Sequence, residues 1–407
     1  MSLLSRREAI GVFLVFAFAY FYSALIRAIT ATISPILTQE FALNAGDLGL
    51  LAGGYFLGFA ATQLPLGKWL DRHGPKRVIA CLLSLAVLGC LAFSVADNFM
   101  ALLAARILCG VGVSACLMAP LTGYRRWFAP GMQLRANSWM LMTGSLGMVA
   151  ATLPVQWLMP VTGWRAMFWG LAALVLLAIG LILWWVPTWQ RAPAPIPGGG
   201  YADVWRHPYF RKMAPIGFFS YGGLVAIQTL WAVPWMIKVG GYDPNRAAAG
   251  LFWINMSMLG TFWTWGMISP WMTRRGLHAD RLIALGLPLS FVVLAIIVIA
   301  GPALGPITWA WWALFCVTST FVSLAQPAVA MAFAPQLAGR ALSAYNLVIF
   351  AGVFMVQWGV GLLIDGFGAL GVAQVPAFQL AMAVFLVCCV LAYAFFLGAA
   401  GHNQDRS

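Results

Sequence analysis

Two arginines lie within long apolar stretches, where charged side chains are costly. Arg27 stands 19 residues after Glu8 and 13 before Glu40, so a straight helix holds it about 20 Å or more from both carboxylates. Arg106 stands in the stretch LLAARILCGVG. Because a guanidinium is a planar fork of donors, it can bind a carboxylate or a phosphate through two parallel hydrogen bonds. The chemistry that these residues predict is the binding of an anion.

Polar side chains accompany Arg27 on one face of the helix expected over residues 9–37. They recur at steps of three and four residues, the spacing of one helical face: Tyr20, Ser23, Arg27, Thr30 and Ser34. Such a stripe lines water or a bound solute. Two interpretations of Arg27 stay open: contact with a substrate, and a structural arginine bonded to backbone carbonyls or helix ends. The same two interpretations stay open for Arg106: a role in the site and a structural role.

Other polar side chains in the apolar segments can shape the same pocket. Most polar residues in membranes only bond neighbouring helices, so each is a weaker candidate than Arg27. Tyr221 and Gln228 are favoured, because a spacing of seven residues places them two turns apart on one helical face. The complete set is Gln156, Tyr221, Gln228, Asn255, Gln326, Tyr345, Asn346 and Gln357.

Several other chemistries are disfavoured. The 10 acidic residues lie in loops, in the tails or at segment ends, and the 4 histidines lie in loops or the tail, so a proton relay has no carrier inside the apolar segments. We find no nucleophile–base pair, phosphate-cradling loop or metal cluster, and therefore expect no enzyme, no cofactor and no resident metal. Copper transport is an alternative, since Cys109, Cys116, Met256 and Met258 are soft ligands. Against it, methionines two residues apart point to different helix faces.

The elements that position these residues are membrane helices. With 62% hydrophobic and 8% charged residues over 407 positions, the chain has too little polar surface for a soluble globule. Twelve apolar segments are long enough to cross a bilayer: roughly 9–37, 47–69, 76–96, 99–123, 136–159, 165–187, 213–237, 247–272, 280–301, 305–328, 341–364 and 377–399. We predict an all-α membrane protein of two six-helix bundles, residues 1–187 and 213–407. A Pro- and Gly-rich cytoplasmic linker over 188–212 joins them.

Basic residues set the predicted orientation. The 23 Lys and Arg residues against 10 Asp and Glu give a net charge of +13, which in a soluble protein would suggest nucleic acid. In a membrane protein the simpler explanation is that Lys and Arg gather in cytoplasmic loops. Most fall in the N-terminal tail and the even-numbered loops, and only Arg165, Lys238 and Arg246 fall in odd-numbered loops. Both termini are therefore expected in the cytoplasm, with the lipid bilayer and no nucleic acid as a partner.

The two predicted bundles carry similar loops. GKWLDRHG (67–74) follows the second segment of the first half, and SPWMTRRG (269–276) follows the second segment of the second half. LRANS (134–138) and GRALS (339–343) enter the fifth segment of each half. Matches at corresponding places indicate a parallel internal repeat.

Together these features resemble the major facilitator superfamily. Its signature loop, Gly-x-x-x-Asp-Arg-x-Gly followed by basic residues, is matched here by Gly67, Asp71, Arg72, Gly74, Lys76 and Arg77. The stretches LLAARILCGVG and GWRAMF are similar to the family's helix 4 and its entry to helix 6. The resemblance implies two bundles that alternate access to a midplane site. It also implies a charge-relay latch from Asp71 to Arg72 or Arg135, and a coupling or packing role for Arg106.

The resemblance bears on the cargo as well. A helix-1 arginine is similar to that of the anion-carrying branches, whereas the segment MTGSLGMVAATLP lacks the Gly-Pro pair usual in drug/proton antiporters. We therefore expect a monomeric, multi-pass secondary transporter of the bacterial inner membrane that moves a small organic anion, a carboxylate or a phosphate-bearing metabolite. It would act as a symporter with protons or as an exchanger with a second anion. The alternatives are an importer of a peptide, another neutral or zwitterionic solute or copper, and a non-transporting sensor on the same scaffold.

Overall fold

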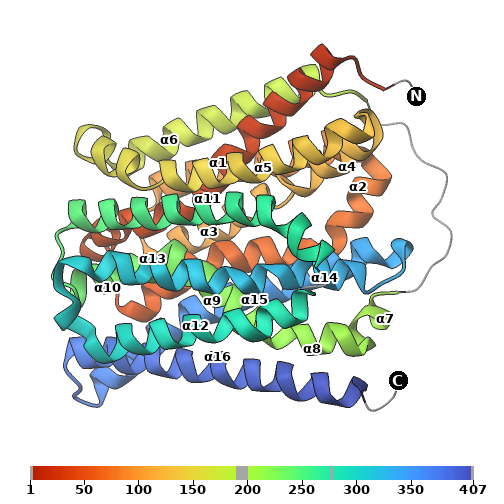
Figure 1. Cartoon of the computed structure of the whole chain (residues 1–407). Helices are drawn as coiled ribbons and strands as arrows, with labels where there is room; N and C mark the ends of the chain where they lie inside the picture. The colour runs from red at the N-terminus through yellow and green to blue at the C-terminus, as the bar shows by residue number, and fades with distance from the viewer. Residues whose placement is uncertain (1–2, 189–199, 276–277, 405–407) are drawn as a thin grey trace. The chain divides into compact units, whose positions relative to one another are not determined.

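The computed structural model describes residues 3–188, 200–275 and 278–404, and the regular elements in these ranges are all helical (Figure 1). The chain forms two compact units. Unit 1 comprises residues 1–30 and 54–196, and unit 2 comprises residues 31–53 and 197–407. The bundle boundaries expected at residues 187 and 213 stay predictions.

Unit 1 contains the first helices of the chain. Helices α1 and α2 each begin or end in unit 2, because residues 31–53 pack there. The helices are α1 (Arg6–Glu40), α2 (Ala45–Val95), α3 (Phe99–Val113), α4 (Met118–Trp127), α5 (Pro130–Ala150) and α6 (Leu153–Trp185). The segment expected over 99–123 is interrupted between α3 and α4, and the segment expected over 136–159 is interrupted between α5 and α6.

Two glycines break helices α2 and α6. Gly74 has φ 76° and ψ 162°, and Gly163 has φ 72° and ψ 161°. These left-handed conformations strain any residue that carries a Cβ atom. Gly74 therefore ends the helical backbone within the signature loop, between the apolar segments expected over 47–69 and 76–96.

Small residues hold α2 against α3. A Cβ atom on Gly58 would lie 2.2 Å from the carbonyl oxygen of Ile107, and one on Gly110 would lie 1.9 Å from that of Tyr55. Backbones approach this closely only where glycine faces them, which is how many membrane helices pack without a hydrophobic driving force. The consequence for the site is that Tyr55 lies directly beside α3.

In its described residues, unit 2 contains ten further α-helices. They are α7 (Tyr201–Arg206), α8 (Pro208–Ile216), α9 (Gly222–Ala226), α10 (Ala232–Lys238), α11 (Pro244–Arg274), α12 (Ala279–Ala300), α13 (Thr308–Ser319), α14 (Ala325–Met331), α15 (Pro335–Ala369) and α16 (Gln374–Gln404). Helix α13 packs on α11 and α12, and α15 packs on α9 and α16. Of the predicted linker, residues 189–199 lie outside the described residues, as does Gly276 of the second loop copy; the rest of the linker forms α7 and the start of α8.

The helical run from α8 to α10 is not uniformly α-helical. Residues Gly217–Tyr221 and Ile227–Trp231 are π-helical. Short π-helical turns are rare and frequently occur at functional sites. Both favoured candidates of this run, Tyr221 and Gln228, lie in these turns.

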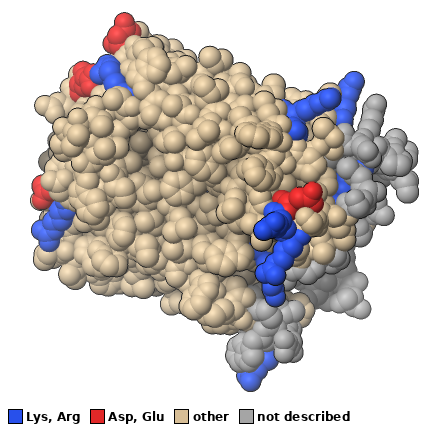
Figure 2. Space-filling view, turned by 90° about the horizontal axis from the view of Figure 1, so that it is seen from above, with Lys and Arg blue, Asp and Glu red and all other residues tan. Residues whose placement is uncertain are grey.

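The outer surface suits a bilayer. Eight helical stretches in the described residues are long and apolar enough to cross a membrane. Figure 2 shows Lys, Arg, Asp and Glu near two opposite margins of the visible face, with an uncharged surface between them. Large apolar side chains such as Leu88 and Leu177 are more than half exposed, which lipid tolerates and water does not. The count of twelve spans and the cytoplasmic termini stay predictions.

Candidate functional site: an arginine cluster and an amide network

Arg27 lies at the centre of a polar cluster in unit 1. Its guanidinium donates hydrogen bonds to the hydroxyls of Tyr20 on α1 and Tyr55 on α2. Its Nε atom is buried and has no hydrogen-bond partner. The hydroxyls of Ser23 and Thr30, on the same face of α1, are also buried and have none in the part of the chain that the structure describes. On this face, a polar ligand or water can therefore satisfy the Ser23 and Thr30 hydroxyls and the Arg27 Nε atom. The Tyr20 hydroxyl already accepts from Arg27, and Ser34 Oγ donates to the carbonyl oxygen of Ala31 at 2.8 Å.

Arg106 supports the same place from α3. It is fully buried, and its Nη1 atom donates a hydrogen bond to the carbonyl oxygen of Ile26, 3.0 Å away. Its guanidinium carbon also lies 5.0 Å from the ring centroid of Tyr55. Ile26 directly precedes Arg27, so Arg106 holds the backbone that carries Arg27. The Nε and Nη2 atoms of Arg106 have no partner.

The charge of this cluster is positive. Among the described residues, the electrostatic neighbours of the two guanidiniums are tyrosine hydroxyls and cysteine thiols, with no carboxylate. Cys90 and Cys109, whose sulfur atoms lie 3.9 Å apart, flank Arg106. Buried cations are normally paired, because removing a charge from water is costly. The two arginines thus have the chemistry of an anion site, with no carboxylate among their electrostatic neighbours in the described residues.

The signature loop lies at the surface of unit 1. Asp71, Arg72 and Arg77 are exposed on α2, and Arg135 is exposed on α5. Gly74 is buried, with the positive φ described above. Gly67 has no atom near the place where a Cβ would stand, so the fold gives no steric reason for glycine there. The latch between Asp71 and an arginine stays a prediction.

Unit 2 holds a network of neutral amides. Gln228 Nε2 donates to Asn255 Oδ1 at 2.9 Å, and Asn255 Nδ2 donates to the carbonyl oxygen of Leu251 at 2.9 Å. Gln357 Nε2 donates to Thr229 Oγ1 at 3.0 Å, and the Trp231 indole donates to the carbonyl oxygen of Gln357 at 3.1 Å. All these side chains are buried. They bond mainly to each other, with the Gln357 Oε1 atom left unpaired.

The remaining candidates of unit 2 lie apart from this network in the hydrogen-bond pattern. Tyr345 is fully buried and donates to the carbonyl oxygen of Met213 at 3.2 Å. Tyr221 is partly buried and is an electrostatic neighbour of Tyr345. Gln326 donates to Asn346 at 2.5 Å. These contacts tie α8, α14 and α15 together.

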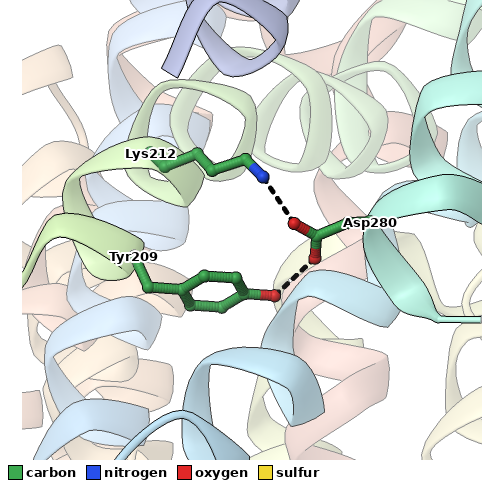
Figure 3. Close-up of polar contacts among 3 residues, drawn as sticks. All are labelled: Tyr209, Lys212 and Asp280. Carbon is green, nitrogen blue, oxygen red and sulfur yellow. Dashed lines mark hydrogen bonds and ion pairs between the residues drawn. The ribbon is translucent and has the colours of Figure 1, made fainter. Parts of the chain in front are cut away.

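An ion pair joins α8 to α12 in unit 2. Lys212 Nζ lies 2.5 Å from Asp280 Oδ2, and the Tyr209 hydroxyl donates to Asp280 Oδ1 at 2.6 Å. Figure 3 shows the Asp280 carboxylate between these two side chains. Lys212 also lies 4.7 Å from the ring centroid of Phe396 on α16. The sequence places these charges in cytoplasmic loops, but does not reveal that Lys212 is buried.

Two participants were missed by the sequence analysis. Tyr55 contacts both arginines, and Thr229 accepts the hydrogen bond of Gln357. The signal for Tyr55 was its place among the glycines of GGYFLG, because glycines mark close helix contacts. Thr229 carried no comparable signal, since its neighbour Gln357 is 128 residues away.

Comparison with known families accounts for this architecture. Residues 16–356 match the sequence model of the Major Facilitator Superfamily. The chain belongs to this superfamily. Membership and the apolar spans make it a multi-pass protein of the bacterial inner membrane. The match confirms the resemblance to the superfamily that the signature loop indicates.

Curated relatives within the superfamily are transporters by name. The chain is 23% identical over 231 residues to the probable L-galactonate transporter of Escherichia coli strain K12, covering 56% of this chain and 50% of the relative. It is 25% identical over 245 residues to the 3-(3-hydroxy-phenyl)propionate transporter of the same strain, covering 54% and 55%. The matches therefore span about half the length of these relatives.

A solved superfamily structure covers nearly the whole chain. It is that of a bacterial homologue of the human lysosomal transporter Spinster, in an inward-facing and unoccupied conformation. The TM-score is 0.77 at 18% sequence identity, over 97% of this chain and 98% of the other. At this identity the likeness shows the fold alone. Because these relatives are transporters, the expectation that the chain is not an enzyme is confirmed.

Proposed function

We propose that this protein is a secondary active transporter that moves a small organic anion across the bacterial inner membrane by alternating access. Arg27 binds the carboxylate or phosphate group of the cargo. The hydroxyls of Tyr20, Ser23 and Thr30 complete the hydrogen bonds around it. Coupling is by symport with a proton or by exchange with a second anion.

The proposal is supported chiefly by Arg27, whose positive charge has no carboxylate among its electrostatic neighbours in the described residues. Its buried Nε has no partner, its other contacts are neutral tyrosines, and a second cation, Arg106, stands behind it. An anion gains most in such surroundings, since a charge-assisted hydrogen bond in a low dielectric is about twice as strong as a neutral one. A cationic cargo would be repelled. The named cargoes of the two relatives, L-galactonate and 3-(3-hydroxy-phenyl)propionate, are both carboxylates.

The roles of the other candidates follow from this proposal. Neutral hydrogen bonds to the cargo come from the polar candidates Tyr221, Gln228, Asn255, Tyr345 and Gln357. Gly67, Asp71, Arg72, Gly74, Arg77 and Arg135 form the gating loop and its latch, and Arg106 couples that movement to Arg27. The superfamily's alternating access provides the framework in which these roles combine.

The test is binding followed by transport. The purified protein is heated with benzoate, L-galactonate, inorganic phosphate, glucose, a dipeptide or Cu(I), and its melting temperature is recorded. We expect carboxylates to raise it in the wild type and in Arg125→Ala, a control that removes an exposed cation of unit 1. Arg27→Ala should abolish the rise. Counterflow in liposomes with the stabilising anion then measures exchange.

Each alternative predicts a different result. Stabilisation by an anion that persists in Arg27→Ala contradicts the assignment of Arg27. Stabilisation by glucose, the dipeptide or Cu(I) alone contradicts the anion class. Binding without exchange of labelled solute identifies a sensor on the same scaffold.

A further inference from the structure

A cavity lies within unit 2. It has a volume of about 480 Å³ and is lined by residues 34–48 together with parts of α10, α15 and α16. We call it the turn pocket, because the turn between α1 and α2 forms one wall. Ser34, the last member of the polar stripe on α1, lines it seven residues after Arg27. Ser34 thus follows Arg27 by about two helical turns on α1.

The turn pocket is lined by one cation and one anion, and only the anion is engaged by other groups. Two charged residues line it, Lys238 and Asp365. Asp365 Oδ1 accepts the backbone N–H of Ala45 at 3.1 Å, and its Oδ2 accepts that of Gly46 at 2.6 Å. Both carboxylate oxygens are therefore engaged by the N-terminus of α2, whose partial positive charge they offset. Lys238 is exposed at the end of α10, and no acidic partner for it is present in the described residues.

One wall of the turn pocket is aromatic and apolar. Trp231 and Phe378 line it as an edge-to-face pair, with ring centroids 6.3 Å apart and an interplanar angle of 76°. The Trp231 indole N–H is already donated to Gln357, so the ring is fixed and presents only carbon to the cavity. Pro234 extends the same wall. A volume of this size is typical of sites for small organic ligands.

We infer that the turn pocket is a capture site for a carboxylate with a flat, apolar body. Lys238 binds the carboxylate, and Trp231 and Phe378 contact the ring or chain behind it. The inference rests on the proposed function in one respect: the captured anion is the one that Arg27 then receives. The ammonium group of Lys238 repels cations, and the aromatic wall disfavours small inorganic anions, which keep their water.

The experiment places a reporter in the pocket wall. Gln374 is exposed there, and Gln374→Cys is labelled with a maleimide in the presence of benzoate or of benzyl alcohol, a neutral molecule of similar shape. The unsubstituted chain corrects for its native cysteines. At a benzoate concentration about four times its dissociation constant we expect labelling about fivefold slower. Benzyl alcohol should leave it unchanged, and labelling of Asn245→Cys, outside the pocket, should not respond.

Variants of the cation complete the test. In the Gln374→Cys background, Lys238→Gln should raise the benzoate concentration needed for half-maximal protection about tenfold. Lys238→Arg should leave that concentration unchanged. Arg246→Gln is the matched control, because Arg246 is a cation stacked on Tyr242 that does not line the pocket. It should behave as the parent.

The outcomes separate this site from the transport proposal. No protection by benzoate, or protection unaffected by Lys238→Gln, overturns the capture site even if liposomes exchange an organic anion. Lys238-dependent protection in a protein that exchanges no solute supports the capture site and overturns the proposed function. Equal protection by benzyl alcohol shows an apolar site with no preference for anions, and also overturns the inference.

Discussion

The interiors of the two units hold different kinds of polar group. In unit 1, Arg27 and Arg106 bring full charges into apolar surroundings and keep buried nitrogens without partners. In unit 2, Gln228, Asn255 and Gln357 are neutral and are mostly paired within the unit. Unpaired charge is costly in the folded protein, whereas paired amides stabilise it. We therefore propose that the arginine cluster of unit 1 recognises charge and that the amide network of unit 2 provides order and neutral contacts.

The largest effect is expected at Arg27. Arg27→Gln should lower kcat/KM for the transported anion by about 100-fold or more, since a buried charge pair broken on one side costs about 3 kcal/mol. Arg27→Lys keeps the charge but loses the planar fork, so we expect a loss of about tenfold. Counterflow in liposomes over a range of substrate concentrations measures both. Equal activity of the Lys and Gln variants would show that charge is not recognised there.

Removing the second cation should separate stability from function. Arg106→Met removes an incompletely bonded buried charge and fills a similar volume, so it should raise the melting temperature of the empty protein. Transport should nevertheless fall about tenfold, because the Ile26 carbonyl beside Arg27 loses its donor. Thermal unfolding without substrate and counterflow are the two measurements. A lower melting temperature with intact substrate affinity would make Arg106 structural.

The amide pair of unit 2 should behave in the opposite sense. Gln228→Ala and Asn255→Ala each leave a buried partner unsatisfied, so each should destabilise the protein by about 1–2 kcal/mol. The double variant should cost less than the sum, and the thermal stabilities of all four proteins give the coupling energy. Transport should change only a few-fold and equally for different anions. Strict additivity would mean that the two amides are not a pair in the membrane.

The smallest effect is expected at the ion pair of α8 and α12. The side chain of Asp280 is 34% exposed, so solvent weakens its attraction to Lys212. Lys212→Met should lower stability by about 1 kcal/mol, and Asp280→Asn, which can still accept from Tyr209, by less. Melting temperatures at low and high salt provide the test. A large loss of transport without destabilisation would instead implicate the pair in coupling.

Much of the fold could be predicted because the bilayer constrains it. Apolar length marks the helices, and the spacing of Tyr20, Ser23 and Thr30 around Arg27 predicts one helical face, whose side chains are buried in the structure. The breaks at Gly74 and at Gly163 follow from a glycine requirement that sequence alone suggests but does not locate. The interruptions after α3 and after α5 were not predicted, since their surroundings are as apolar as the rest.

The site could be predicted only where a residue is unusual by itself. Arg27 and Arg106 are such residues, because each is an arginine in an apolar segment, and the sequence indicates both as candidates. Tyr55 and Thr229 are ordinary in type and matter through contacts with distant parts of the chain. The same holds for Lys238 and Asp365, which the sequence places only at loops or helix ends. Only the structure shows that the N-terminus of α2 binds the Asp365 carboxylate. It also shows Lys238 without an acidic partner in the described residues.

The π-helical turns of the α8–α10 run have a consequence for how sequence length changes can alter this unit. A π turn holds one more residue than an α turn needs, and each residue of an α-helix advances the chain by about 100°. Deleting a single residue within Gly217–Tyr221 could restore a regular helix and leave the far end in place. A single deletion in the regular turn that follows would instead rotate Gln228 off its face. A one-residue deletion should therefore be tolerated in the π-helical turn. In the regular turn that follows, the same deletion should change the direction of the Gln228 amide.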